Sequence, residues 1–348
     1  MEKKQLVSRR NALLGIAGIA AVDVGAFLGV TGRLGTPELT PAAFADRFEQ
    51  VYGKHEGFRR NHAKGVSVAG RFESNGAGTE VCSAFRTGEY PVTGRFSLSG
   101  GMPYAPDAAA TVRGLGLRVE LPHGEQWRTA MVNIPVFLDR TPEGFADRIV
   151  AYAADPATGK PDPQRTAEFL RQHPETVKAM AYVKAHPPSP GFADSTFHGL
   201  NAFLATNDDG NTVPIRWTFE PVGLTTTQAT GSNHLFDAAV EAVRNAPLRW
   251  QLVLTIAEPG DPTGDATTPW PGNRRRITAG TLTLSTVETE ATGNARDVNF
   301  DPTVLPSGLA VSDDPLLSAR SAVYARSYER RTGEPKHPSA VQVREVPA

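Results

Sequence analysis

Eight short apolar segments, bounded by glycine, proline, aspartate or asparagine, place the strongest constraint on the fold of this chain. In the first of them Val66, Val68 and Phe72 alternate with more polar neighbours, as in a half-buried strand. The eight segments are residues 66–72, 94–99, 115–121, 127–133, 202–206, 213–219, 250–256 and 277–284. Strands this short, with turn residues between them, predict an antiparallel barrel or sandwich.

Helical patterns lie between and after these strands. Thr40 is a suitable N-cap and Pro41 a suitable first residue for one helix. Phe44, Phe48 and Val51 follow at spacings of four and three, and form its apolar face. Further helices are predicted at residues 141–153, 163–172, 175–186, 235–244 and 314–331. The fold class is therefore α+β, a strand core with inserted helices and a C-terminal helix.

Composition excludes several classes of function. The formal net charge is −1, so no overall field favours nucleic acid, and we expect no nucleic-acid partner. Cys82 is the only cysteine, which rules out an intrachain disulfide framework, a cysteine-based zinc cluster and thioether attachment of a haem. The sequence is compatible with either a monomer or a homodimer.

The N-terminus is typical of an export signal. Two lysines and two arginines within the first ten residues precede an apolar run from residue 12 to residue 30. The stretch Ser8-Arg9-Arg10-Asn11-Ala12-Leu13 further resembles a twin-arginine (Tat) signal. We therefore expect residues 1–35 to be a Tat-type export signal or an N-terminal anchor. The protein is then periplasmic or exported, with anchoring to the inner membrane as the alternative to cleavage.

Two positions carry distinctive chemistry. His62 lies just before the first strand, and an imidazole can take a proton from one oxygen of a peroxide and return it to the other. Tyr324 follows Arg320 by four residues, so both lie on one face of the last predicted helix. A guanidinium favours ionisation of a phenol, and a tyrosinate can bind haem iron. By themselves, these residues fit a structural histidine and a solvated helix better than a catalytic site.

Motifs around His62 add a resemblance. Arg-x-x-His-Ala-Lys-Gly, from Arg59 to Gly65, resembles the distal-histidine motif of haem catalases. Arg95-Phe96-Ser97 is similar to that family's Arg-Phe-Ser. The resemblance implies that Ser97 hydrogen-bonds the catalytic His62, and that Arg59 and Arg95 bind haem propionates.

A third segment continues the resemblance. Pro135-Val136-Phe137, followed by Phe145, is similar to the family's Pro-x-Phe strand end and to a later phenylalanine, both of which line the distal pocket. The family carries an asparagine three residues before this proline, where the present chain has Val132, and Asn133 is next. Either Asn133 enters the pocket as a catalytic residue, or the amide is absent. Adjacent strand residues face opposite sides, so Val132 and Asn133 cannot both face the pocket.

The last helix resembles the family's proximal helix. Arg320 and Tyr324 form its Arg-x-x-x-Tyr pattern, and Arg331 follows seven residues after the tyrosine. The resemblance implies that Tyr324 is the metal ligand, that Arg320 supports it, and that Arg331 binds a propionate. Asn201 stands where the family has a histidine behind the haem.

The resemblance covers roughly residues 38–340, with residues 36–348 as a single catalase-like haem domain. It implies an antiparallel eight-stranded β-barrel of the haem catalase type and non-covalently bound haem b (iron protoporphyrin IX). The chain is most similar to minimal catalase-related peroxidases. We therefore expect reduction of hydrogen peroxide or organic peroxides by a small organic electron donor, with weak catalase activity.

Two alternatives remain open. Catalase-fold enzymes that rearrange lipid hydroperoxides share the histidine and tyrosine positions. A non-enzymatic alternative is an envelope haem-binding or redox-sensing protein that has lost catalysis together with the amide at Val132.

Overall fold

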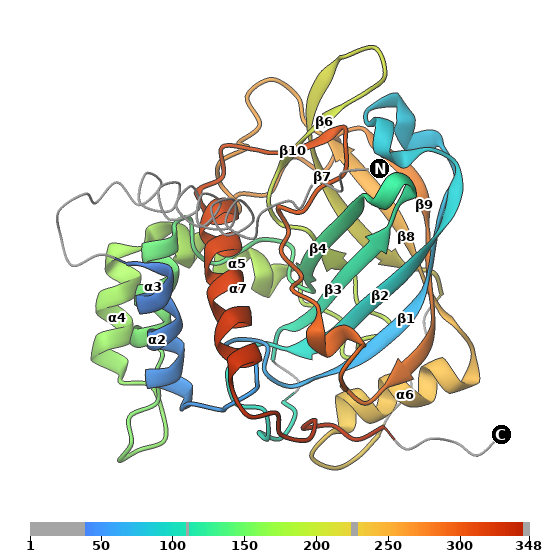
Figure 1. Cartoon of the computed structure of the whole chain (residues 1–348). Coiled ribbons are helices and arrows are strands. Elements are labelled where there is room, and N and C mark those ends of the chain that lie inside the picture. Colours follow the sequence, from blue (N-terminus) through green and yellow to red (C-terminus); the bar gives the residue numbers. More distant parts are fainter. Residues whose placement is uncertain (1–38, 109–110, 224–228, 344–348) are drawn as a thin grey trace, which may run out of the picture.

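Eight antiparallel strands close into a barrel in the computed structural model, which describes residues 39–108, 111–223 and 229–343 (Figure 1). Around the ring the order is β7, β5, β4, β3, β2, β1, β9 and β8, and pairing of β8 with β7 completes the closure. The strands are β1 (Gly65–Ser74), β2 (Gly88–Leu98), β3 (Arg113–Glu120), β4 (Gln126–Val132), β5 (Phe197–His198), β7 (Thr212–Pro221), β8 (Leu248–Ile256) and β9 (Arg276–Glu288). The predicted eight-stranded antiparallel barrel is confirmed.

One strand of the ring differs from those expected from the sequence. Every predicted segment contains a strand, but residues 202–206 form β6 (Phe203–Thr206), which pairs with β7 and with β10 (Leu309–Val311) beside the ring. The two-residue strand β5 closes the barrel, since His198 pairs with Val132 on one side and Phe197 with Phe219 on the other. A two-residue strand is too short to show a period in sequence.

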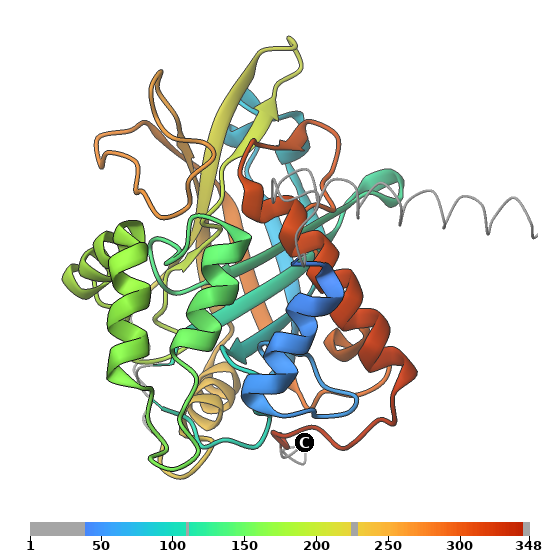
Figure 2. The ribbon, with the colours of Figure 1, turned by 90° about the vertical axis from the view of Figure 1, so that its left-hand side faces the viewer.

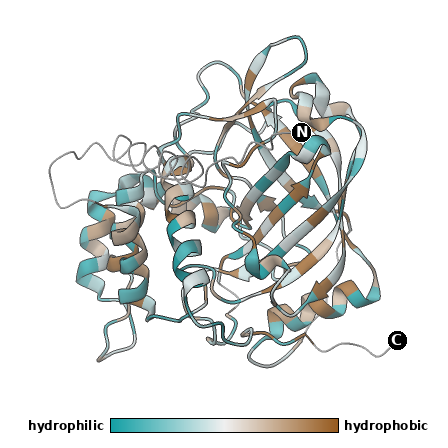
Figure 3. Cartoon of the chain, viewed as in Figure 1, coloured by the Kyte–Doolittle hydropathy of each residue, from teal (hydrophilic) through white to brown (hydrophobic). Residues whose placement is uncertain are grey.

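The barrel interior is the main core. Along β4, Trp127, Thr129 and Met131 are buried, while the residues between them are only partly buried. This alternation of side chains across a strand is visible as hydrophobic and hydrophilic bands in Figure 3. Aromatic rings fill the interior, with Trp127 and Trp217 in an edge-to-face contact at 5.4 Å. The outward faces of β3 and β4 are therefore free to form part of a second compartment.

Helices supply the other wall of that compartment. The described residues contain α2 (Pro41–Tyr52), α3 (Pro142–Ala151), α4 (Pro163–Gln172), α5 (Pro174–Ala185), α6 (His234–Asn245) and α7 (Pro315–Gly333). The described residues also contain four short 3₁₀ helices, namely η1 (Ala77–Glu80), η2 (Ser83–Phe85), η3 (Pro122–Gly124) and η4 (Ala295–Asp297). The predicted start of α2 is confirmed, since Thr40 accepts a hydrogen bond from the Ala43 N–H at 3.1 Å.

The helices α2, α3 and α7 pack on one another outside the barrel (Figures 1 and 2). Their apolar side chains form a second cluster, which includes Phe44 and Phe48 of α2 and Ala319 and Ala322 of α7. Figure 2 shows α2 and α7 side by side in front of the barrel strands. The two largest apolar clusters of the described residues thus lie in the barrel and in the helical layer, and the candidate site lies between them.

The predicted export signal, residues 1–35, lies outside the described residues. Among the described residues, no helix has both the length and the hydropathy to cross a membrane. The assignment of residues 36–348 to a single haem domain remains a prediction.

Candidate active site

A cavity lies between the outer face of the barrel and the helical layer. It gathers residues from distant parts of the sequence, since Arg59 and His62 precede β1 while Arg320 and Tyr324 lie on α7. Nine of the ten site residues predicted from the sequence line it, namely Arg59, His62, Arg95, Ser97, Phe137, Phe145, Arg320, Tyr324 and Arg331. The exception is Asn133, which is not among the described residues that line the cavity.

His62 occupies a turn with left-handed backbone geometry. Its φ is 54°, a conformation that a residue with a side chain adopts at a cost of roughly 1–3 kcal/mol. Three contacts hold it. The His62 N–H donates to Asn61 Oδ1 at 2.9 Å, its carbonyl accepts from Arg95 Nη1 at 2.7 Å, and ring Nδ1 lies 3.0 Å from Ser97 Oγ. Both the backbone and the ring of His62 are therefore oriented by neighbours.

The imidazole of His62 is held in its neutral form. Burial lowers the pKa of His62 from 6.5 to about 3, and the guanidinium groups of Arg95, Arg320 and Arg59 add to this effect. A neutral ring whose Nδ1 faces Ser97 has Nε2 left for the cavity. His62 is thus a base that is unprotonated throughout the physiological pH range.

Small residues on the outer face of the barrel make room for this ring. A Cβ added at Gly114 of β3 would lie 2.8 Å from Ser97 Oγ and 3.0 Å from the His62 ring. A Cβ at Gly116 would lie 2.8 Å from the ring of Phe300. Neither glycine was predicted as a site residue, although both interrupt a strand that carries Leu115, Leu117 and Val119, and a glycine within a strand often marks close approach of other groups.

The structure decides between Val132 and Asn133. Val132 lines the cavity, together with Ala130 two residues earlier on the same face of β4. Asn133 is 3% exposed, and its Oδ1 accepts from the Arg113 N–H at 2.9 Å. Its Nδ2 has no partner among the described residues. The prediction that Asn133 is catalytic is therefore corrected, because the alternation of strand faces turns this amide away and leaves Val132 in its place.

Arg320 connects Tyr324 to the barrel. Its Nη2 lies 3.5 Å from the Tyr324 hydroxyl and donates to the Ala130 carbonyl at 2.8 Å. Its Nη1 donates to Asn201 Oδ1, and Asn201 Nδ2 donates to Asp314 at 2.7 Å. Asp314 is the N-cap of α7 and accepts from the Leu316 N–H. The Asp314 carboxylate therefore caps α7 and also orients the Asn201 amide, which supports Arg320.

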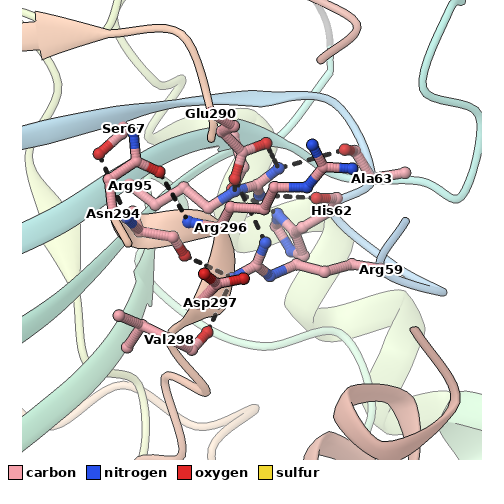
Figure 4. Close-up of polar contacts among 12 residues, drawn as sticks. Arg59, His62, Ala63, Ser67, Arg95, Glu290, Asn294, Arg296, Asp297 and Val298 are labelled. Carbon is pink, nitrogen blue, oxygen red and sulfur yellow. Dashed lines mark hydrogen bonds and ion pairs between the residues drawn. The ribbon is translucent and has the colours of Figure 1, made fainter. Parts of the chain in front are cut away.

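Arg59, Arg95 and Arg331 also line the cavity. Figure 4 shows Arg59 and Arg95 beside the buried carboxylate of Glu290. Glu290 contacts Arg95 at 2.7 Å and Arg59 at 3.3 Å. Burial opposes ionisation of Glu290, but Arg95, Arg59 and Arg331 outweigh it and lower its pKa to about 2. Burial and the neighbouring Arg95 lower the pKa of Arg331 to about 10. Glu290 could not be predicted as a site residue, since nothing in the sequence places it near the motifs.

These residues fit a haem. No hydrogen bond among the described residues uses the Nε–H of Arg59 or of Arg331, so both can donate to carboxylates at the same end of the cavity. Tyr324, backed by Arg320, is on the helical wall, and His62 is on the barrel wall. Aromatic rings border the interior, with Phe137 and Phe145 in edge-to-face contact at 5.2 Å.

Comparison with known families decides the identity of this arrangement. The Catalase family model matches residues 32–341 of the chain. The chain belongs to the catalase family. The resemblance predicted from the motifs is thereby confirmed, and members of this family typically bind haem.

Two relatives of similar length align with most of this catalase-family chain. A catalase-related peroxidase of Synechococcus elongatus is 35% identical over 336 residues, which span 94% of this chain and 99% of the relative. A catalase-related peroxidase of Mycolicibacterium paratuberculosis is 30% identical over 304 residues, covering 85% of this chain and 96% of the relative.

Solved structures confirm the fold. A bacterial catalase superposes with a TM-score of 0.68 at 21% identity, covering 86% of this chain and 62% of that chain. Catalase A from Saccharomyces cerevisiae gives a TM-score of 0.68 at 19% identity, covering 86% of this chain and 66% of that chain. This catalase-family chain thus retains the barrel and adjoining helices of longer proteins.

Gly114→Ala should slow the reaction of the haem-loaded protein with peroxide by about 10–100-fold, because a displacement of a catalytic group by about 1 Å has effects of this size. The new methyl group would press on Ser97 Oγ and on the His62 ring. Stopped-flow absorption measures the rate constant. Gly272→Ala is the matched control, since no atom lies within 4 Å of its added Cβ, and an equal loss in both variants would contradict the assignment.

The rate constant with peroxide should be independent of protonation of His62 from about pH 8 down to about pH 5, because the pKa of His62 is about 3. The folded pKa lies below the unfolded value, so protons bind preferentially to the unfolded chain. The contribution of His62 to stability therefore declines as the pH falls from about 6.5 towards about 3. A midpoint near pH 6.5 that disappears in His62→Ala would contradict this prediction.

Proposed function

We propose that this protein is a haem-dependent peroxidase that reduces hydrogen peroxide or organic peroxides with a small organic electron donor. The observation that carries the proposal is the pairing of a neutral imidazole with an arginine-supported phenol on the two walls of one cavity. The near-full-length likeness to catalase-related peroxidases supports the same reaction class.

Haem b is the proposed form of the cofactor. Tyr324 would bind the iron as a phenolate, with Arg320 beside its oxygen. Arg59 and Arg331 would bind the carboxylates, and Arg95 lies next to them. Cys82 is buried in the barrel core and accordingly offers no covalent attachment. When bound, a haem would supply the two electrons that cleave the peroxide O–O bond, from its iron and its porphyrin ring together.

His62 moves the protons of this reaction. Ser97 holds Nδ1, so Nε2 takes the proton from the peroxide oxygen that approaches the metal. The protonated ring then returns this proton to the departing oxygen, which leaves as water or an alcohol. The low pKa of His62 makes the second transfer favourable, since a protonated imidazole in this environment is a strong acid.

The walls of the cavity favour an organic donor over a second peroxide. Val132 offers no hydrogen bond where an amide would orient a second hydrogen peroxide for oxidation. Phe44, Phe48 and Phe145 form an apolar border, with Phe44 and Phe145 at 5.5 Å, that suits a small aromatic reductant. Weak catalase activity follows from the missing amide.

The same apolar border favours a second candidate function, the rearrangement of a lipid hydroperoxide, because an alkyl chain would pack against these phenylalanines and Val132. The two functions differ in their need for a reductant. Consumption of a lipid hydroperoxide without any electron donor would support rearrangement, and dependence on the donor would support the peroxidase.

We also propose that the protein is exported to the periplasm or remains anchored to the inner membrane. The support is the basic and apolar N-terminal sequence with its twin-arginine pattern.

Tyr324→Phe should alter the absorption spectrum of the haem-loaded protein and abolish most of its peroxidase activity, because the phenyl ring has no oxygen for the metal. Absorption spectra before and after haem addition measure this. Tyr152→Phe is the matched control, since the Tyr152 hydroxyl contacts Met180 outside the cavity. A wild-type protein that takes up no haem would refute the proposed function.

Val132→Asn should raise oxygen release from hydrogen peroxide by about five- to tenfold, since one well-placed hydrogen bond contributes about 1–1.5 kcal/mol. An oxygen electrode measures the release, with peroxidase turnover recorded in parallel. Val132→Ala, which removes bulk without adding an amide, should leave oxygen release low. Equal gains in both variants would show that space, and not the amide, limits the catalase reaction.

A further inference from the structure

Glu290 is a buried carboxylate to which neither the motifs nor the proposed reaction assigns a role. It lies two residues after the end of β9 and is 7% exposed. Its Oε1 accepts a hydrogen bond from Arg95 Nε at 2.7 Å, and its Oε2 accepts one from Arg95 Nη2 at 3.0 Å. Oε1 also accepts a hydrogen bond from Arg59 Nη1 at 3.3 Å. Figure 4 shows Glu290 between these two guanidinium groups. The Arg95–Glu290 contact is a two-pronged ion pair.

The other side of Arg95 faces the turn that carries His62. Arg95 Nη1 donates to the His62 carbonyl at 2.7 Å, and Nη2 donates to the Ala63 carbonyl at 3.1 Å. A guanidinium has five N–H donors, so these four bonds leave about one for any other acceptor. Arg95 is therefore committed mainly to the protein, whereas Arg59 and Arg331 keep donors for the carboxylates of a haem.

The backbone below Arg95 is shaped for this contact. A Cβ added at Gly65 would lie 2.5 Å from Arg95 Cζ, so the guanidinium rests directly on the first residue of β1. Arg59 and Arg331 lie on the same side of the cavity, and Arg331 and Arg95 each lower the pKa of Arg59. The buried Arg95 and Arg331 and the partly buried Arg59 repel one another at one end of the cavity, and Glu290 is the carboxylate that contacts two of them.

We propose that Glu290 is a positioning residue for His62. Its carboxylate holds Arg95 against the carbonyls of His62 and Ala63, and this keeps the left-handed turn that directs the imidazole into the cavity. The inference rests on the proposed role of His62 as the base that reacts with peroxide.

A second consequence concerns haem retention. Replacing Glu290 with a neutral residue removes a negative charge, so the end of the cavity that would bind the haem carboxylates becomes more positive. Haem retention should then be unchanged or stronger, while proton transfer by His62 weakens. A purely structural role would instead lower both, because a loosened cavity would lose its haem and its reactivity together.

Glu290→Gln in the haem-loaded full chain should reduce the rate constant with hydrogen peroxide by about 10–100-fold, the usual effect of removing an outer partner of a site residue. The rate of hydrogen cyanide binding should fall in parallel, because the same imidazole takes the proton of this ligand. The rate of haem transfer to an excess of apomyoglobin should stay the same or decrease. Stopped-flow absorption measures all three rates.

Glu288→Gln is the matched control, since Glu288 is exposed at the end of β9, two residues before Glu290. The decisive comparison uses a His62→Ala background, in which Glu290→Gln should have no further effect on the peroxide reaction. An equal loss with and without His62, or haem transfer accelerated as much as the peroxide reaction is slowed, would overturn the inference.

The proposed function and this inference fail in distinguishable ways. A wild-type protein that does not bind haem or react with peroxide removes the proposed function. A reactive wild type whose Glu290→Gln variant is indistinguishable from it removes only the role of Glu290.

Discussion

The left-handed turn at His62 is the constraint on which the candidate site depends. A non-glycine residue holds this conformation only where surrounding contacts outweigh its strain, and here the N–H, carbonyl and ring of His62 each have a partner. The partners come from separate elements, with Asn61 in the turn itself and Arg95 and Ser97 on β2. Pairing of β1 with β2 therefore determines the position of the imidazole.

The division of the chain into a barrel and a helical layer explains how one cavity has two different walls. Outward faces of β3 and β4 provide small or apolar residues such as Gly114 and Val132, which leave space beside the imidazole. The helical wall provides Tyr324 and Arg320, spaced so that both reach the same region. An imidazole and a phenol oxygen can thus face one cavity although they lie far apart in sequence.

Local features of the chain were predictable because their causes are local. Thr40 and Pro41 begin α2 as expected, and α4 spans the predicted residues, since a cap and a proline act within one turn. The two-residue strand β5 could not be predicted, because its pairing with β4 and β7 depends on contacts made only after closure. Strand β6 was predicted correctly as a strand, but its place beside the ring depends on β10.

The sequence by itself determined the chemistry, since the identities and order of His62, Ser97, Arg320 and Tyr324 limit the reaction that the chain can support. Tertiary structure decided which groups meet. The pleat of β4 put Val132 rather than Asn133 in the cavity, and the end of β9 brought Glu290 to Arg95 over a separation of 195 residues. The positions of these side chains depend on strand register and on contacts between distant segments, which spacing along the chain does not reveal.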